Sequence, residues 1–150
     1  MSGKIIIVGA TGYTGTALAK LLKQENIDCH LIGRNESELE KLANETGQSF
    51  SVCSNVNDEQ SVSESLSSIA NDKIIGLAYC VGSIVLKSFQ TTKTDDFINT
   101  FNLNVTGAIH FIKKLQKQLA DNNGSIVLFS TVAVDRGFNM HSVISTAKGA

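Results

Sequence analysis

The stretch KIIIVGATGYTG, residues 4–15, carries the strongest signal for the fold. A short run of mostly β-branched residues ends in three glycines, and residues 16–22 (TALAKLL) then have helical character. A strand entering a glycine-rich turn at a helix N-terminus is typical of a phosphate-binding turn, because the first helical N–H groups lack partners and favour an anion. Gly9 suits a sharp turn, Gly12 a close backbone approach to pyrophosphate, and Gly15 close helix packing. The spacing is GxxGxxG rather than GxGxxG, so an ordinary tight strand–helix turn stays an alternative.

Length and composition limit the possible functions. At 150 residues the chain can form one domain with a substantial core. The net charge is −1 and no run of lysine or arginine is present, which argues against nucleic acid or an anionic membrane surface as a partner. No apolar stretch approaches the ~18 residues of a membrane span, and the run at 5–8 is too short for the apolar core of a signal peptide.

Three cysteines, Cys29, Cys53 and Cys80, are widely spaced and lie in or beside apolar segments. Their odd number and spacing indicate buried free thiols in a reducing compartment, so we expect a cytoplasmic protein. The cysteines and histidines form no CxxC or HxxxH spacing, and no metal site is predicted.

Five short apolar runs alternate with helix-like segments, at residues 5–8, 29–32, 50–53, 74–79 and 126–129. Continuous apolar strands in such an alternation imply a parallel sheet covered on both faces. Right-handed crossovers then favour an α/β, doubly wound, Rossmann-like sheet, for which we predict the strand order 3-2-1-4-5. The order reverses between the first and fourth strands, so the glycine turn should face the segment after the fourth strand across a crevice.

Helix starts are predicted at Asn35, Asn57, Thr94 and His141. The first helix should end at Gly47, the second at about 70, and the third keeps helical spacing to 120. The chain stops inside the last helix, which would leave the fifth strand as a bare edge. We therefore expect residues 1–150 to be a dinucleotide-binding domain that is incomplete at its C-terminus.

The end of the second strand favours NADP over NAD. Its sequence is LIGRN, residues 31–35, without the acidic residue that typically binds the ribose hydroxyls. Arg34 instead offers a planar fork of donors that suits a 2′-phosphate. The alternative is a solvated surface arginine.

Taken together, ordered motifs along the entire chain resemble the short-chain dehydrogenase/reductase family. They are GATGYTG (9–15), Arg34, NV (55–56), AYCVG (78–82), NVTG (104–107), SIVLFST (125–131) and AK (147–148). The resemblance implies hydride transfer between a nicotinamide and a carbonyl or alcohol. The glycine spacing is more similar to the extended or atypical branches than to the commonest one.

The resemblance also implies site residues. Those implied for cofactor binding are Gly9, Thr11, Gly12, Tyr13, Thr14, Gly15, Arg34, Asn55, Val56, Cys80, Val81, Gly82 and Lys148. Asn55 stands where the family has an acid, and residues 79–82 (YCVG) stand where it has Asn-Asn-Ala-Gly. The family's lysine, which holds the nicotinamide ribose, matches Lys148; its relay asparagine matches Asn104, and its substrate-positioning serine falls on Thr131.

The family's acid/base tyrosine falls on Ile144, which can neither donate nor accept a proton. The chain's tyrosines, Tyr13 and Tyr79, are expected at turns on the cofactor side. His141 lies three residues before Ile144 on the same helix face, and imidazole titrates near neutrality. His141 and Thr131 with a water are thus candidate donors; a solvent-exposed histidine at a helix start is the alternative.

The sequence predicts an atypical short-chain NADP(H)-dependent oxidoreductase acting on a small molecule. A regulatory dinucleotide-binding protein without turnover is the alternative, and an epimerase or lyase that uses the nicotinamide transiently is a third reading. Homo-oligomerisation of a longer chain stays an alternative to a monomer.

Overall fold

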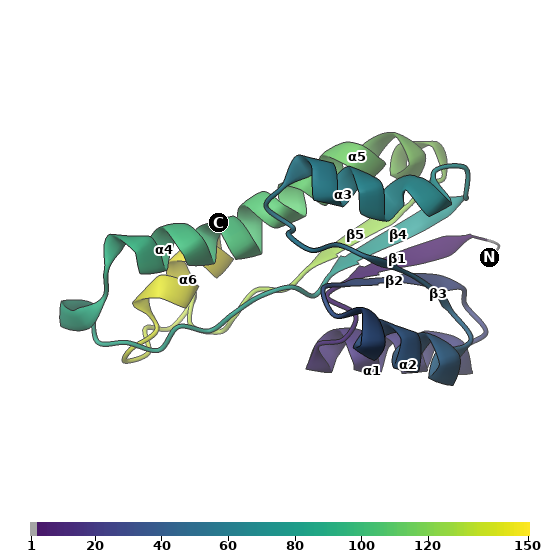
Figure 1. Ribbon diagram of the computed structural model, residues 1–150. Coiled ribbons are helices and arrows are strands. Elements are labelled where there is room, and N and C mark those ends of the chain that lie inside the picture. Colours follow the sequence, from purple (N-terminus) through teal and green to yellow (C-terminus); the bar gives the residue numbers. More distant parts are fainter. Residues whose placement is uncertain (1–2) are drawn as a thin grey trace.

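Five parallel strands form one sheet in the computed structural model, which describes residues 3–150. The strands are β1 (Lys4–Val8), β2 (Cys29–Gly33), β3 (Ser49–Val52), β4 (Ile74–Tyr79) and β5 (Ser125–Leu128). Their order is β3-β2-β1-β4-β5, as predicted. Figure 1 shows α1 (Tyr13–Gln24) and α2 (Glu36–Thr46) on one face of the sheet, with α3 (Glu59–Leu66) and α5 (Gly107–Asp121) on the other. The predicted doubly wound fold is confirmed.

Each face of the sheet buries its own apolar cluster. Ile6 packs in the cluster beneath α3 and α5, whereas its neighbour Ile7 packs in the cluster beneath α1 and α2. Both side chains are fully buried. Successive strand residues point to opposite faces, so a strand covered on both faces needs a continuous apolar run. This is why residues 5–8 predict a central strand.

Two helix starts differ in how well the sequence predicted them. α2 has Asn35 as its N-cap and ends at Gly47, whose φ of 72° is left-handed, as expected. For α3 the expected cap Asn57 is wrong: Asp58 accepts the Ser61 N–H at 2.8 Å. Asparagine and aspartate are about equally preferred as N-caps, so the sequence could not show which of the neighbours Asn57 and Asp58 begins α3.

The predicted long helix from residue 94 to 120 contains an irregularity. α4 (Thr94–Phe101) leads into a π-helical segment, η3 (Asn102–Thr106), and then into α5. Figure 1 shows α4 and α5 as one rod that extends past the end of the sheet. Spacing alone did not predict the π turn, because one extra residue hardly changes the apolar pattern on either side.

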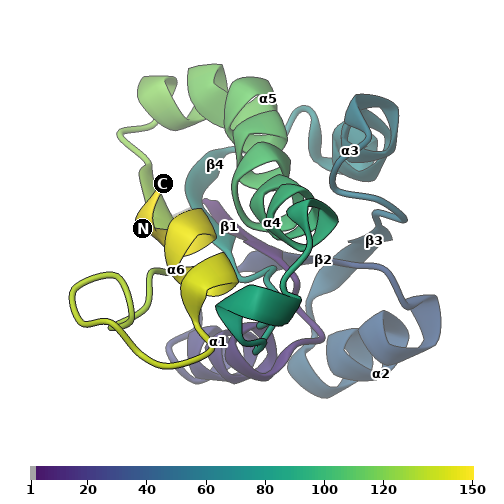
Figure 2. The same cartoon turned by 90° about the vertical axis from the view of Figure 1, so that its left-hand side faces the viewer.

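The projecting half of the rod packs against α6 (Ser142–Gly149), beyond the carboxyl ends of the strands (Figures 1 and 2). At its start, Lys87 and Asp96 form an ion pair with an N–O distance of 2.8 Å.

All four residues of β5 are exposed. Within residues 3–150 no helix has the length and apolarity required to cross a membrane.

Candidate functional site

The glycine turn after β1 is built from close backbone contacts. Gly9 has a φ of +80°, a left-handed value that favours glycine, and its N–H donates to the Ile32 carbonyl oxygen of β2 at 2.8 Å. A Cβ atom on Gly15 would collide with the Gly9 carbonyl oxygen and the Ala10 Cα. Glycine at both positions therefore lets α1 start directly against the end of the strand.

The start of α1 presents backbone donors beside an open space. Gly12 is the N-cap, and a Cβ there would meet only the Gly9 carbonyl oxygen, at 3.2 Å. The N–H groups of residues 13–15 precede the first helical hydrogen bond, which Thr16 makes to Gly12 at 2.8 Å. Tyr13 is 96% exposed, which means that its side chain points into solvent. We therefore expect Tyr13 to contribute its backbone N–H, not its side chain, to this turn. An anion fits such a cradle.

A cavity of about 820 Å³ lies along the ends of β2, β1 and β4. This is the size range of cofactor sites. The predicted cofactor residues that line it are Gly9, Thr11, Gly12, Arg34, Val56, Cys80, Val81 and Gly82. Those that do not line it are Tyr13, Thr14, Gly15, Asn55 and Lys148. The glycine turn and the segment after β4 thus face one cavity, at the reversal of strand order.

One end of the cavity combines a cation with two carboxylates. Arg34 is exposed at the end of β2, and Glu36 and Glu38 from the first turn of α2 line the same end. Neither glutamate is among the site residues predicted from the sequence. A signal was present, since Glu36 and Glu38 come two and four residues after Arg34 in the sequence.

At the other end, Gly82 brings together two predicted catalytic residues. A Cβ atom on Gly82 would lie 2.8 Å from Asn104 Oδ1 and 3.4 Å from Lys148 Nζ. Asn104 is buried; its Nδ2 donates to the Thr100 carbonyl oxygen at 2.8 Å, while its Oδ1 has no hydrogen-bond partner among residues 3–150. A buried acceptor without a partner is costly, so this oxygen suits a ligand or water that donates.

Burial also affects the titrating groups near Gly82. Burial lowers the pKa of the Lys148 ammonium below its ordinary value, with the Cys80 thiolate acting in the opposite direction. Burial raises the pKa of the Cys80 thiol to about 11, and the Lys148 charge opposes that rise. Near neutral pH, Cys80 is therefore a thiol, and Lys148 loses its proton more readily than a surface lysine.

The two candidate proton donors are placed differently. Thr131 Oγ1 accepts the Ala133 N–H at 3.3 Å. His141 is the half-buried N-cap of α6, and its Nδ1 lies 2.7 Å from the Asn139 carbonyl oxygen, to which it donates. Within the described residues, no hydrogen bond joins either side chain to Asn104 or Lys148. Ile144 is 3% exposed, so an apolar side chain fills the position of the family's tyrosine.

Tyr79 does not lie on the cofactor side, contrary to the expectation from sequence. It is the last residue of β4, is 2% exposed, and donates from its hydroxyl to the Leu103 carbonyl oxygen at 2.7 Å. Alternation along the strand turns Tyr79 into the core and leaves Cys80 at the cavity. Gly107 makes room for the hydroxyl, because a Cβ there would overlap it. This glycine was the one sequence signal for the contact.

Comparison with known proteins gives a consistent result. The sequence profile of a family described as short chain dehydrogenase matches residues 3–150. Serine 3-dehydrogenase of Agrobacterium fabrum is 30% identical over 145 residues, which cover 89% of this chain and 55% of that protein. A tropinone reductase homolog of Arabidopsis thaliana is 28% identical, covering 97% of this chain and 56% of that protein. The chain thus spans about half the length of these two relatives.

A solved structure of actinorhodin polyketide ketoreductase with NADPH has a TM-score of 0.88 at 17% identity. The match covers 99% of this chain and 60% of that one, and at this identity it supports the fold.

Among residues 3–150, no group of three histidine, cysteine or acidic side chains is arranged to hold a metal ion.

Proposed function

Because this chain belongs to the short-chain dehydrogenase family, we propose that it is an NADP(H)-dependent oxidoreductase acting on a small carbonyl or alcohol substrate. One observation carries the proposal. A single cavity has the glycine turn in its wall and Arg34 at one end, with Gly82, beside Asn104 and Lys148, at the other. A dinucleotide has the same sequence of chemical groups: an adenosine end, a pyrophosphate and a nicotinamide end.

The chain's own residues would divide the work as follows. The N–H groups at the start of α1 hold the pyrophosphate, and Arg34 pairs with a 2′-phosphate. The nicotinamide, when bound, supplies or accepts the hydride. Lys148 holds the ribose next to it, and Asn104 Oδ1 orients a water in the crevice. Thr131 positions the substrate oxygen, and His141 supplies the proton that Ile144 cannot.

A dinucleotide-binding protein without turnover is the second candidate. The buried Ile144 favours it, since the position of the family's acid has no titrating group. It shares the cavity and the cofactor with the first proposal, so only turnover separates the two. For either, the unpaired thiols of Cys29, Cys53 and Cys80 support a cytoplasmic location.

Calorimetry with NADPH and NADH tests the cofactor preference. A charge-assisted pair at Arg34 is worth about 1.5–3 kcal/mol, so we expect NADPH to bind roughly ten- to a hundredfold more tightly than NADH. Arg34→Asp should reverse this order, whereas the exposed Arg136→Asp should leave it unchanged. Glu36→Gln should strengthen NADPH binding slightly. Equal affinities for both dinucleotides in the unmodified protein would contradict the preference.

Turnover is then measured with a panel of aldehydes and ketones and either reduced dinucleotide. Consumption of NADPH that depends on a carbonyl compound supports the oxidoreductase. Tight binding without consumption over the whole panel favours the regulatory alternative.

A further inference from the structure

His110, on α5, connects that helix to the loop between β3 and α3, residues 53–58. Its Nδ1 atom lies 3.0 Å from the Val56 carbonyl oxygen. A carbonyl oxygen only accepts, so this ring nitrogen carries a proton and donates it to the bond. The His110 side chain is 12% exposed, which shields the contact from most of the solvent.

This contact is the one hydrogen bond between the loop and α5 in the part of the chain that the structure describes. The other bonds of the loop stay within it or lead to β2 and α3. The Asn57 N–H donates to Asn55 Oδ1 at 3.0 Å, and the Asn55 N–H donates to Ser61 Oγ at 3.3 Å. We therefore expect a loop without the His110 bond to keep its local turn and to lose its fixed position against α5.

Glu59 lies at the other ring nitrogen of His110. Its Oε1 is 3.8 Å from His110 Nε2 and 3.4 Å from Lys113 Nζ. The Glu59 and Lys113 side chains are both more than half exposed, so these ion pairs contribute little. The shielded bond to the Val56 carbonyl is therefore the stronger restraint on the loop.

The loop forms part of the wall of the large cavity, which Cys53 and Val56 line. Val56 packs directly on α5: a Cβ atom on Gly107 would lie 2.8 Å from Val56 Cγ2. Gly107 and His110 are three residues apart and thus lie on one face of the helix. One helix face therefore receives the side chain of Val56 at Gly107 and its carbonyl oxygen at His110.

The sheet order indicates which half of a dinucleotide this wall would meet. β3 is the neighbour of β2, so the loop lies next to the strand end that carries Arg34. Gly82 follows β4, on the other side of β1. This inference rests on the proposed function for its ligand: Arg34 pairs with the 2′-phosphate, and Val56 offers an apolar side chain to the same adenosine half.

We propose that His110 is a positioning residue for the adenosine half of the dinucleotide. By holding the Val56 carbonyl oxygen, it fixes the part of the cavity wall against which that half binds. His110 itself does not line the cavity, so it acts through Val56. Its loss should weaken the binding of adenosine-containing ligands and leave the surroundings of Gly82 unchanged.

Calorimetry with adenosine 2′,5′-bisphosphate, which carries only the adenosine end of NADPH, tests the assignment. His110→Phe keeps an aromatic ring but removes the donor. It should weaken the binding of this fragment and of NADPH by the same factor, about three- to tenfold, the contribution of one hydrogen bond. His110→Asn has an amide nitrogen at the same distance from the backbone as Nδ1, and should restore most of the affinity.

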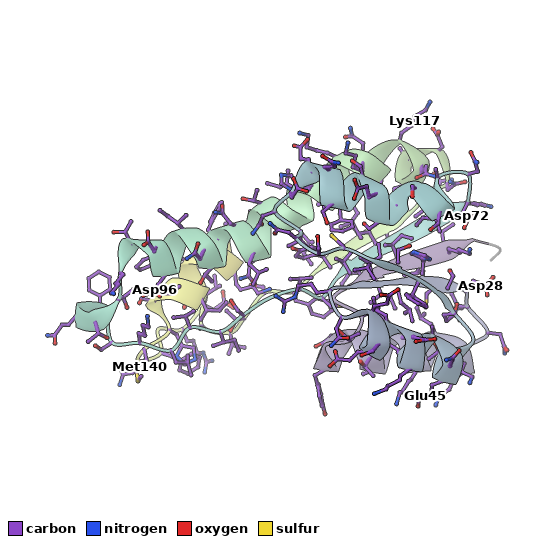
Figure 3. The ribbon with its side chains drawn as sticks, viewed as in Figure 1. Asp28, Glu45, Asp72, Asp96, Lys117 and Met140 are labelled. Carbon is purple, nitrogen blue, oxygen red and sulfur yellow. The ribbon has the colours of Figure 1, made fainter. Side chains whose placement is uncertain are left out.

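Thr46→Val is the matched control. It removes another buried bond from a side chain to the backbone, the 2.6 Å bond from Thr46 Oγ1 to the Leu42 carbonyl oxygen. Thr46 ends α2 beside Glu45, on the opposite face of the sheet from α5 (Figure 3). This variant should bind adenosine 2′,5′-bisphosphate as tightly as the unmodified protein.

Hydrogen exchange separates positioning from a general loss of stability. In His110→Phe the amides of residues 54–58 should exchange faster, and in His110→Asn they should return to their original rate. The peptide around Gly82 should keep its rate in both variants. Faster exchange in both peptides would show a general structural role and overturn the proposal. Should the phenyl ring disturb the packing, His110→Leu removes the donor with a smaller side chain.

Undiminished affinity of folded His110→Phe for adenosine 2′,5′-bisphosphate would overturn the inference, as would equal weakening in His110→Asn. With NADPH still bound by the unmodified protein, either result would leave the proposed function standing. An unmodified protein that binds neither NADPH nor the fragment would contradict the proposed function, and with it the ligand assigned to this wall.

Discussion

The Tyr79 hydroxyl donates a 2.7 Å hydrogen bond to the carbonyl oxygen of Leu103, inside the π-helical segment that also carries Asn104. A π turn disturbs the regular pairing of backbone carbonyls, and here a side chain from β4 satisfies one of them. Asn104 itself donates to Thr100 across the same segment. The sheet thereby fixes the helical position from which Asn104 reaches Gly82.

Tyr79→Phe should loosen this segment. Loss of one buried hydrogen bond leaves the Leu103 carbonyl without its donor, which should lower the free energy of unfolding by about 1–2 kcal/mol in urea titrations. If Asn104 acts in the crevice, turnover should fall as well, because its carboxamide is no longer held. Tyr13→Phe is the control: its ring is 96% exposed, so stability should stay within about 0.5 kcal/mol. Equal stability of the two variants would show that the hydroxyl contributes nothing.

Gly12→Val should abolish dinucleotide binding and leave the fold intact. A Cβ atom at this position would meet only the Gly9 carbonyl oxygen, and we expect the branched side chain to occupy the space offered to the pyrophosphate. Calorimetry measures the binding and circular dichroism the fold. Gly137→Val, in open surroundings, should behave like the unmodified protein in both measurements. A folded Gly12→Val protein with full cofactor affinity would exclude the cradle.

Stability should fall in mild acid because of His30. This residue of β2 is 1% exposed, with Nδ1 and Nε2 each 2.8 Å from a serine hydroxyl of β3, those of Ser49 and Ser51. Burial, and secondarily Lys4, lowers the pKa of His30 to about 4, with Asp72 opposing. The unfolded chain, with a histidine pKa of about 6.5, therefore binds the proton first as pH falls.

The free energy of unfolding keeps its full value above about pH 6.5, the histidine pKa of the unfolded chain. It declines by up to roughly 3 kcal/mol as the pH falls to about 4, the pKa of His30 in the folded protein. Urea titrations at a series of pH values measure it. His30→Gln can still pair with a serine but does not titrate, and should flatten this part of the profile. His141→Gln should not. A profile of His30→Gln that parallels the unmodified protein would rule out His30 as the cause.

Turnover, where it occurs, should depend on His141. His141→Ala should reduce kcat about 10²–10⁴-fold, the usual contribution of general acid–base catalysis, with little change in NADPH affinity. Ile144→Tyr restores a phenol one turn before Lys148 and should raise carbonyl reduction. Steady-state rates of the three proteins decide between donors. Undiminished kcat in His141→Ala would move the assignment to Thr131 with a bound water.

Much of the architecture could be predicted because it depends on local patterns. The continuous apolar run at 5–8 indicates a strand covered on both faces. A glycine at position 47, after a helical segment, indicates a helix that ends in the left-handed conformation. Features that depend on tertiary contacts were missed. The inward turn of Tyr79 became visible only from its contact with Leu103. The resemblance implied Asn104 and Lys148 as site residues, but that both lie against Gly82 became visible only from the contacts that a side chain there would make. Residues on separate elements leave no spacing in the sequence from which a distance can be read.

The π-helical segment has a consequence in terms of chain length. A π turn holds one residue more than the α-helical turn it replaces, so the rod formed by α4 and α5 contains one residue that a regular helix would not need. Deleting a single residue between Asn102 and Thr106 would let the hydrogen-bond ladder close, while α4 kept its face toward α6 and α5 its face toward the sheet. We expect the fold to survive that deletion and the Asn104 carboxamide to leave its place beside Gly82. Under the role proposed for Asn104, the number of residues in this helix sets the position of its carboxamide, so an insertion or deletion there should affect the chemistry before it affects the fold.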